Sequence, residues 1–143
     1  MSLDSEITQQ LRRDEGEVLH AYQDHLGYWT IGIGILIDKR KGGGITAEES
    51  EYLFRNRLNA KRDELRRRLP WFDKLDEARQ GVLLNMAFQM GVEGLLGFKN
   101  TLAMIERGDY DAASEGMLQS KWADQTPERA VRLAEQMRTG VWH

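Results

Sequence analysis

Two carboxylates and a threonine lie near the start of the chain, in a segment rich in glycine and apolar residues. Glu15 is followed nine residues later by Asp24, and Thr30 comes six residues after that. Glycoside hydrolysis uses such a pair: a protonated carboxyl donates to the leaving oxygen, and an ionised carboxylate acts as base or nucleophile. A threonine hydroxyl adds a group that positions water. A helix end followed by a solvated hairpin explains the same residues without chemistry, and on these residues alone both interpretations stay open.

The surrounding segments predict the elements that position these side chains. Residues 5–13 have the spacing of a short amphipathic helix, and Gly16 suits its C-terminal end. Residues 21–38 alternate and are rich in tyrosine, tryptophan, threonine and isoleucine, which is typical of strands and a hairpin. A turn between the two carboxylates excludes a shared helical face and is compatible with opposite walls of a cleft.

A long helix is expected after the hairpin. The glycine-rich residues 41–44 form a flexible turn, and Thr46 with Glu49 then forms a capping-box pattern. Apolar residues recur at helical spacing from there, and Pro70 sets the end of the helix.

The remainder of the chain reads as helical. Residues 75–90 predict a helix that is apolar on nearly all sides and therefore buried, with a glycine-rich break after it from Gly91 to Gly97. Two short helices are expected at residues 100–108 and 109–119. The last helix, at 126–140, has Thr126 as its N-cap, a proline at its first position and a glycine after its end.

These elements predict an α+β fold, mainly helical, in a single domain of residues 1–143. A small N-terminal β-hairpin lobe (about 14–45) is joined by a long helix (about 46–69) to a larger helical lobe (about 70–143). A chain of 143 residues suits one domain with a sizeable core. A cleft between the lobes is the natural ligand site.

Composition narrows the classes of partner. The net charge of −3 does not suggest a nucleic-acid-binding protein, and none is expected. The chain has no cysteine, so no disulfide or thiolate metal site is expected. The polar first residues do not resemble a signal peptide, and no apolar run approaches the length of a membrane span, so stable membrane insertion is not expected.

The segment around the carboxylates resembles the active site of the phage-type lysozymes. The signature of that family is Glu, eight residues, Asp or Cys, five residues and Thr, and Glu15, Asp24 and Thr30 keep both spacings. The resemblance covers about residues 8–143. Further similar segments are GITAEESEYLF, LLNMAFQMGVEGLLGF, SKWADQTPERAVR and RTGVWH.

The resemblance implies hydrolysis of the β-1,4 bond between N-acetylmuramic acid and N-acetylglucosamine in peptidoglycan. Glu15 would be the general acid, and Asp24 would activate the attacking water with help from Thr30. Such a route inverts the anomeric configuration and separates the carboxyls by about 6.5–9.5 Å. No cofactor and no metal ion are expected.

The resemblance also implies sugar-binding residues along a cleft. Gly34 and Leu36 match cleft-lining positions of the small lobe. The helical lobe contributes five more candidates: Phe88, Gln89, Thr101, Thr126 and Arg129. Plain core packing is an equal explanation for Phe88. Gln89 needs a hydrogen-bond partner in its apolar helix, and either a ligand or a backbone carbonyl would serve.

Three departures from the family pattern stand out. Ile35 occupies the position of a histidine usually described as a structural ion-pair partner. The segment from Leu36 to Thr46 is shorter than in well-known members, which predicts a simpler hairpin. Gly116 occupies a position near the cleft where a well-known member of the family has an asparagine, so one sugar contact of that member is expected to be missing here.

The expected setting is a phage or prophage endolysin that lyses its host. It would act as a monomer on peptidoglycan glycan strands. It would be made without a signal peptide in the host bacterial cytoplasm and would reach the wall once a separate holin-like protein has permeabilised the membrane. Two alternatives remain from sequence: a lytic transglycosylase, and a non-catalytic wall-binding module on the same fold.

Overall fold

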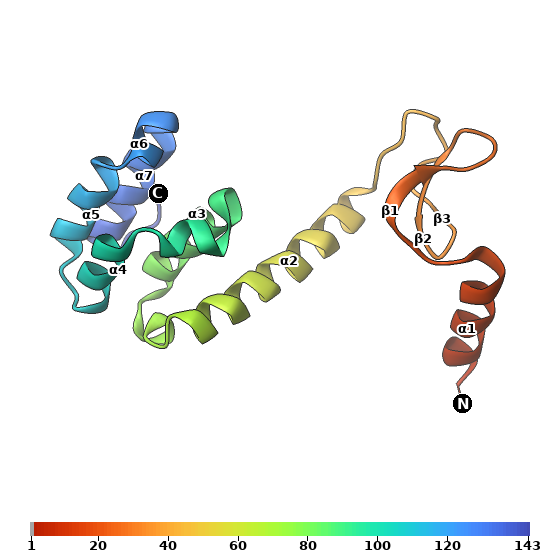
Figure 1. Cartoon of the computed structure of the whole chain (residues 1–143), viewed down its shortest axis with the longest axis horizontal. Coiled ribbons are helices and arrows are strands. Elements are labelled where there is room, and N and C mark those ends of the chain that lie inside the picture. Colours follow the sequence, from red (N-terminus) through yellow and green to blue (C-terminus); the bar gives the residue numbers. More distant parts are fainter. Residues whose placement is uncertain (1) are drawn as a thin grey trace. The chain divides into compact units, whose positions relative to one another are not determined.

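Strands are confined to the first part of the chain, and helices form the rest (Figure 1). The structure, a computed structural model, describes residues 2–143. These residues form seven α-helices, one short 3-10 helix and three strands. They divide into two compact units, one ending at Phe54 and the other beginning at Arg55. The predicted α+β class, with a small N-terminal sheet followed by helices, is confirmed.

The first helix, α1 (Leu3–Glu15), ends on the expected glycine. The Ser2 hydroxyl caps its start by accepting the Ser5 N–H at 3.1 Å. At the other end, Gly16 has a φ of 76° and donates its N–H to the Arg12 carbonyl at 3.0 Å. A positive φ favours glycine, so this residue ends the helix and turns the chain toward the sheet. The helix runs past residue 13, which makes Glu15 its last residue.

The predicted hairpin is a three-stranded antiparallel sheet in the order β1-β2-β3. Thr30 lies in the central strand, with Tyr22 as its partner on β1 and Leu36 on β3. An irregularity in β1 between Val18 and Tyr22 interrupts the register. The strands are β1 (Val18–Gln23), β2 (Trp29–Gly32) and β3 (Ile35–Leu36).

The long helix α2 (Ala47–Arg68) begins at the predicted capping box. The Glu49 N–H donates to the Thr46 hydroxyl at 3.1 Å, and the Thr46 N–H donates to the Glu49 carboxylate at 2.9 Å. Both donors would otherwise lack partners at a helix start. The helix ends before Pro70, as the sequence predicts.

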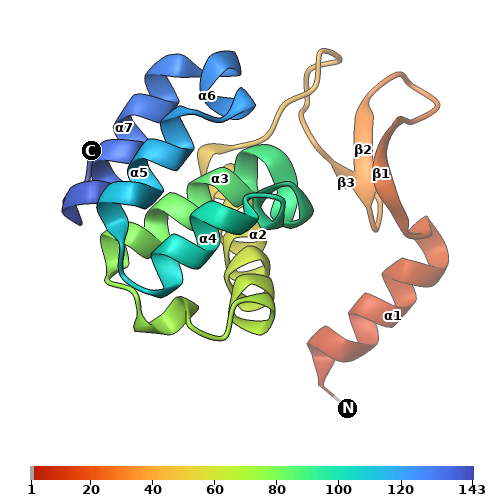
Figure 2. The same ribbon diagram turned by 60° about the vertical axis from the view of Figure 1, so that its left-hand side comes forward.

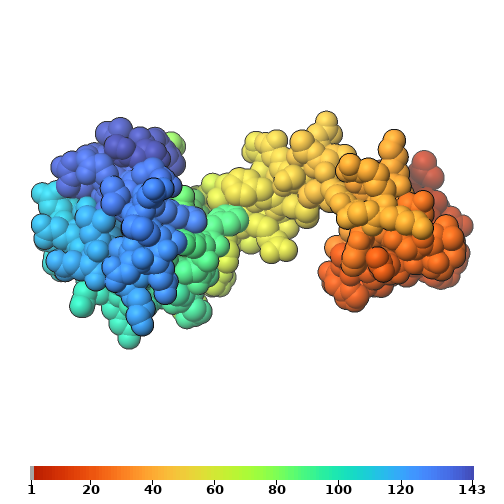
Figure 3. All heavy atoms as spheres, turned by 90° about the horizontal axis from the view of Figure 1, so that it is seen from above, coloured from red at the N-terminus to blue at the C-terminus, as the bar shows by residue number. Residues whose placement is uncertain are grey.

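The apolar core lies in the helices of the second unit. Buried apolar side chains of the described residues run from Leu65 to Met137 and form one cluster. Helices α5 and α7 run side by side in both views (Figures 1 and 2). In the space-filling view the residues coloured from green to blue form one continuous mass (Figure 3). The helices are α3 (Glu77–Leu96), α4 (Lys99–Glu106), α5 (Tyr110–Leu118), α6 (Lys121–Gln125) and α7 (Pro127–Thr139), with the short η1 (Phe72–Lys74) before α3.

Three details differ from the sequence prediction. The expected break after residue 90 is a kink at Gly91, where φ is 79°, and helical structure resumes and includes Gly94. Helix α6 was not predicted, because five residues carry too little periodicity to reveal a helix. Thr126 begins α7, but its side chain does not cap it and donates instead to the Trp122 carbonyl at 3.1 Å.

Within residues 2–143 no single helix is long and apolar enough to cross a membrane. Helices α3 and α4 reach that length and apolarity only when they are taken together, and a 102° bend separates them.

Arg79 fastens α3 to the C-terminal end of α7. Its Nε donates to the Met137 carbonyl at 2.6 Å, and its Nη2 donates to the Arg138 carbonyl at 3.0 Å. The guanidinium also lies 3.6 Å from the ring centroid of Tyr110. Carbonyls at a helix end lack intrahelical donors, so this cation satisfies them and complements the negative end of the helix dipole.

We expect Arg79→Met to lower the free energy of unfolding by about 2–3 kcal/mol, since it removes charged hydrogen bonds and a cation–π contact. Urea denaturation followed by circular dichroism measures the change. Arg132→Met is the matched control, because Arg132 is an exposed arginine on α7. Equal stability of the two variants would contradict the assigned role of Arg79.

Candidate active site

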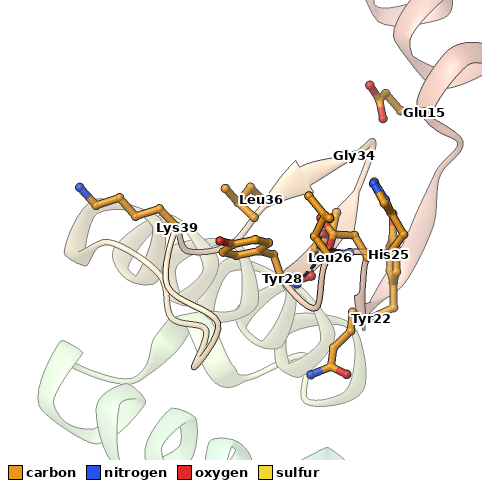
Figure 4. A pocket seen from close by; sticks show the side chains of 11 residues that line it. Glu15, Tyr22, His25, Leu26, Tyr28, Gly34, Leu36 and Lys39 are labelled. Atoms are coloured by element: carbon orange, nitrogen blue, oxygen red, sulfur yellow. Dashed lines mark hydrogen bonds between the residues drawn. The ribbon is translucent and has the colours of Figure 1, made fainter.

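Glu15 is held at the end of α1 against the backbone of Gly34. A Cβ built on Gly34 would lie 2.8 Å from both the Cβ and the Oε2 atoms of Glu15, closer than real side chains approach. Gly34 also has a φ of 61°, so its conformation and its surroundings both require glycine. Figure 4 shows the Glu15 carboxyl on the side of α1 that faces Gly34.

Asp24 organises the turn between β1 and β2. Its Oδ1 accepts the N–H groups of Leu26 and Tyr28, both at 2.9 Å. Its backbone N–H donates to the Tyr28 carbonyl at 2.8 Å, and its carbonyl accepts the Gly27 N–H at 3.0 Å. An aspartate that bonds the backbone two residues on is the common Asx-turn arrangement. The carboxylate therefore shapes the hairpin and is positioned by it.

These hydrogen bonds lower the pKa of Asp24. The Tyr28 N–H makes the largest contribution, and the Leu26 N–H and the neighbouring His25 charge act in the same direction against partial desolvation. Hydrogen bonds to the ionised form stabilise it over the neutral acid. Asp24 consequently stays ionised at a lower pH than an ordinary aspartate does.

Glu15, Asp24 and Thr30 line one open pocket with a volume of about 760 Å³ (Figure 4). Thr30 is buried, and its hydroxyl donates to the Tyr28 carbonyl at 3.2 Å. Gly34 and Leu36, the two expected cleft residues of this unit, line the same pocket. The first unit alone thus brings together the residues that the motif singled out.

Six further residues of the pocket carry no signal in the motif. They are distributed over β1, the turn and the segment after β3, so only the pairing of the strands brings them to one place. Tyr22 is the exception that strand pairing makes predictable, since it lies opposite Thr30. The six are Tyr22, Gln23, His25, Leu26, Tyr28 and Lys39.

Gly34→Ala should displace the Glu15 carboxyl and lower kcat by about 10²-fold, the cost of misplacing a reacting group by about 1 Å. Gly32→Ala is the matched control. Its φ of 67° imposes similar backbone strain, but its added Cβ would meet only Ile35 Cδ1 at 3.5 Å. Initial rates of wall solubilisation compare the two variants. Equal losses would attribute the effect to backbone strain and would contradict a contact role for Gly34.

The lowered pKa of Asp24 predicts a stability that depends on pH. A carboxyl whose folded pKa lies below its ordinary 3.8 stabilises the fold above that value, and the contribution is lost as pH falls through the folded pKa. We expect the difference in melting temperature between wild type and Asp24→Asn to be constant above about pH 5 and to shrink in stronger acid. A difference that grows as the pH falls would contradict this.

The five candidate residues of the second unit lie on α3 and beyond it. Phe88 is 37% exposed, so plain core packing does not describe it. The Gln89 Oε1 accepts the Trp122 Nε1–H at 2.8 Å, and within residues 2–143 no backbone carbonyl is its partner. Its amide NH₂ is the part of the side chain that remains to donate to a sugar substituent.

Thr101, Thr126 and Arg129 have different surroundings. Thr101 is buried beside Gly116, where an added Cβ would lie 2.9 Å from the Thr101 hydroxyl, and both line a second pocket of about 550 Å³. The Thr126 hydroxyl donates to a backbone carbonyl, as noted above. Arg129 donates through Nη2 to the Asn85 Oδ1 atom at 2.6 Å. The sugar-binding roles of all five remain predictions.

Comparison with known proteins identifies the family of the chain. The sequence profile of the family described as "Phage lysozyme" matches residues 12–136. "Probable T4-type lysozyme 1" of Dictyostelium discoideum is 34% identical, and the match covers 96% of each chain. The "Endolysin" of Salmonella phage P22 is 30% identical over 90% of this chain and 89% of its own length. "Pre-baseplate central spike protein Gp5" of Enterobacteria phage T4 is 34% identical over 94% of this chain, which spans 28% of that protein.

The family match and these relatives place the chain among the glycoside hydrolases of the lysozyme class. The match across residues 12–136 is more specific: the chain belongs to the phage lysozyme family. The resemblance inferred from the spacing of Glu15, Asp24 and Thr30 is thereby confirmed.

Proposed function

We propose that this protein is a muramidase that hydrolyses the β-1,4 bond between N-acetylmuramic acid and N-acetylglucosamine. The observation that carries the proposal is the convergence of Glu15, Asp24 and Thr30 on one pocket, in a member of the phage lysozyme family. Peptidoglycan is the substrate that this membership implies, and the similar P22 protein is named an endolysin. No observation favours the transglycosylase or the binding module.

Glu15 donates the proton that the leaving oxygen needs. It projects from the end of a helix into an open pocket, where a glycosidic oxygen can approach it. The close contact with Gly34 restricts where its carboxyl lies. A positioned acid of this kind contributes about 10²–10⁴-fold to the rate.

Asp24 and Thr30 hold and activate the attacking water. Both backbone hydrogen bonds to Asp24 fall on Oδ1, so Oδ2 has the freer lone pairs for a proton from water. The Thr30 O–H is directed to the Tyr28 carbonyl, which leaves its own oxygen free to accept from the same water. Attack by this water on the face opposite the leaving group inverts the anomeric configuration.

The proposed setting is host lysis. The protein acts as a monomer that accumulates in the host cytoplasm and degrades peptidoglycan after a separate holin-like protein has permeabilised the membrane. Phe88, Gln89, Thr101, Thr126 and Arg129 are its proposed sugar contacts on the helical unit.

Mass spectrometry of a peptidoglycan digest tests the reaction. A muramidase releases fragments that end in reducing N-acetylmuramic acid and have gained one water. Fragments ending in the anhydro sugar would identify a transglycosylase instead. Binding of the folded protein to intact walls without release of fragments would identify a non-catalytic module.

A further inference from the structure

Three consecutive cations follow β3, and each has different surroundings. The Arg40 guanidinium is paired with the Asp38 carboxylate, with Nη2 and Oδ2 2.7 Å apart. Lys41 lies with its Nζ 5.8 Å from the ring centroid of Tyr28. Within residues 2–143, no carboxylate lies within ion-pairing distance of Lys39, whose neighbour Asp38 is engaged by Arg40.

The segment that carries these cations is fixed to the hairpin. Asp38 also accepts the Arg40 backbone N–H at 2.9 Å, which closes a tight turn. Gly43, with a φ of 73°, approaches the indole of Trp29 so closely that an added Cβ would lie 2.5 Å from its Cδ1. The Ile37 N–H donates to the Trp29 carbonyl at 2.9 Å, so Trp29 of β2 holds the chain on both sides of Lys39.

Lys39 lines the same pocket as Glu15 and Asp24. In Figure 4 it lies at the opposite end of the pocket from Glu15, beyond Tyr28 and Leu36. The pocket therefore has a carboxyl at one end and an unpaired ammonium at the other. The ammonium is exposed, so it meets a ligand without first breaking an ion pair.

We propose that Lys39 determines specificity by binding a carboxylate of the peptide that substitutes the muramic acid residue. This proposal rests on the proposed muramidase function. The N-acetylated sugars of the glycan are neutral, and the anionic groups near the scissile bond belong to the attached peptide. A cation at the pocket end contacts that charge, while Glu15 and Asp24 act on the bond in the same pocket.

Chemical neutralisation of the substrate tests the proposal. Peptidoglycan treated with carbodiimide and ammonia has its carboxylates converted to amides and keeps its glycan and peptides. On native peptidoglycan, Lys39→Met should lower kcat/KM by about two- to fivefold, the range expected for one exposed ion pair. The loss should lie mainly in KM. On amidated peptidoglycan, wild type and Lys39→Met should be equally active, and Lys39→Arg should resemble wild type on both substrates.

Two control variants test whether the effect belongs to Lys39 or follows from the loss of any one positive charge. Lys74→Met removes the same charge from η1, outside the pocket, and Lys41→Met removes the neighbouring cation. Neither should discriminate between native and amidated substrate. An equal loss for Lys39→Met on both substrates, or no loss on either, would overturn the proposal.

A binding readout keeps the proposal independent of turnover. Co-sedimentation with intact walls is measured for Glu15→Gln with and without Lys39→Met. The double variant should bind native walls about two- to fivefold more weakly and amidated walls equally. If the wild type released no fragments but the two variants still differed in binding to native walls, the proposed muramidase function would be wrong and the proposed Lys39 contact would be supported. Equal binding to native walls would overturn the contact itself.

Discussion

Glu15→Gln lowers the rate of wall clearing by about 10²–10⁴-fold and leaves the fold intact. The amide is nearly isosteric with the carboxyl, so the end of α1 and its contact with Gly34 are retained. The amide carries no acidic proton for the leaving oxygen, so bond cleavage loses its acid. Turbidity loss of outer-membrane-stripped Gram-negative cells measures the rate, and circular dichroism checks the fold.

Glu17→Gln is the matched control for that experiment. Glu17 lies two residues further on, pairs with Arg12 at 3.2 Å and is not among the residues that line the pocket. Its replacement makes the same chemical change without touching the site, so clearing should continue at nearly the wild-type rate. Normal clearing by Glu15→Gln would remove Glu15 from the mechanism.

Asp24→Asn should reduce kcat by about 10²–10³-fold through loss of the base. The amide oxygen still accepts the Leu26 and Tyr28 N–H groups, so the turn is kept. The amide nitrogen replaces Oδ2 and cannot take a proton from water. Initial rates on soluble glycan fragments measure kcat separately from KM.

Asp38→Asn is the corresponding control. Asp38 is also a turn aspartate that accepts a backbone N–H, and hydrogen bonds to Arg40 lower the pKa of its carboxyl as well. It lies in the segment after β3 and does not line the pocket with Glu15. Comparable loss of kcat in both variants would show that turn geometry, rather than the base at Asp24, limits the reaction.

Local sequence signals predicted the elements that carry the site. Gly16 ends α1, the capping box at Thr46 begins α2, and the alternating residues form the sheet. Each signal acts over a few residues, through backbone conformation or a nearby hydrogen bond, and is therefore visible in sequence. The convergence of Glu15, Asp24 and Thr30 needed the family resemblance, because spacing alone does not fix how strands pair.

Long-range contacts were not predictable in the same way. The Arg79 contacts with the end of α7 join residues 58 and 59 positions apart in the chain. The Trp122 bond to Gln89 spans 33 positions, and tryptophan was not among the partners expected for Gln89. Lys39 is one of three adjacent cations. It differs from the other two because Arg40 pairs with Asp38 and Lys41 lies against the ring of Tyr28. Such contacts depend on packing between elements rather than on local propensity.

The anomeric configuration of the first-formed product tests most directly whether Glu15 acts as acid and Asp24 as the base for water. Proton NMR of a soluble glycan digest, recorded before mutarotation, distinguishes the two anomers of the new reducing end. Direct attack by a water that Asp24 activates predicts the α anomer from the β-linked substrate. Initial appearance of the β anomer would contradict this assignment and would make Asp24 a nucleophile in a double displacement.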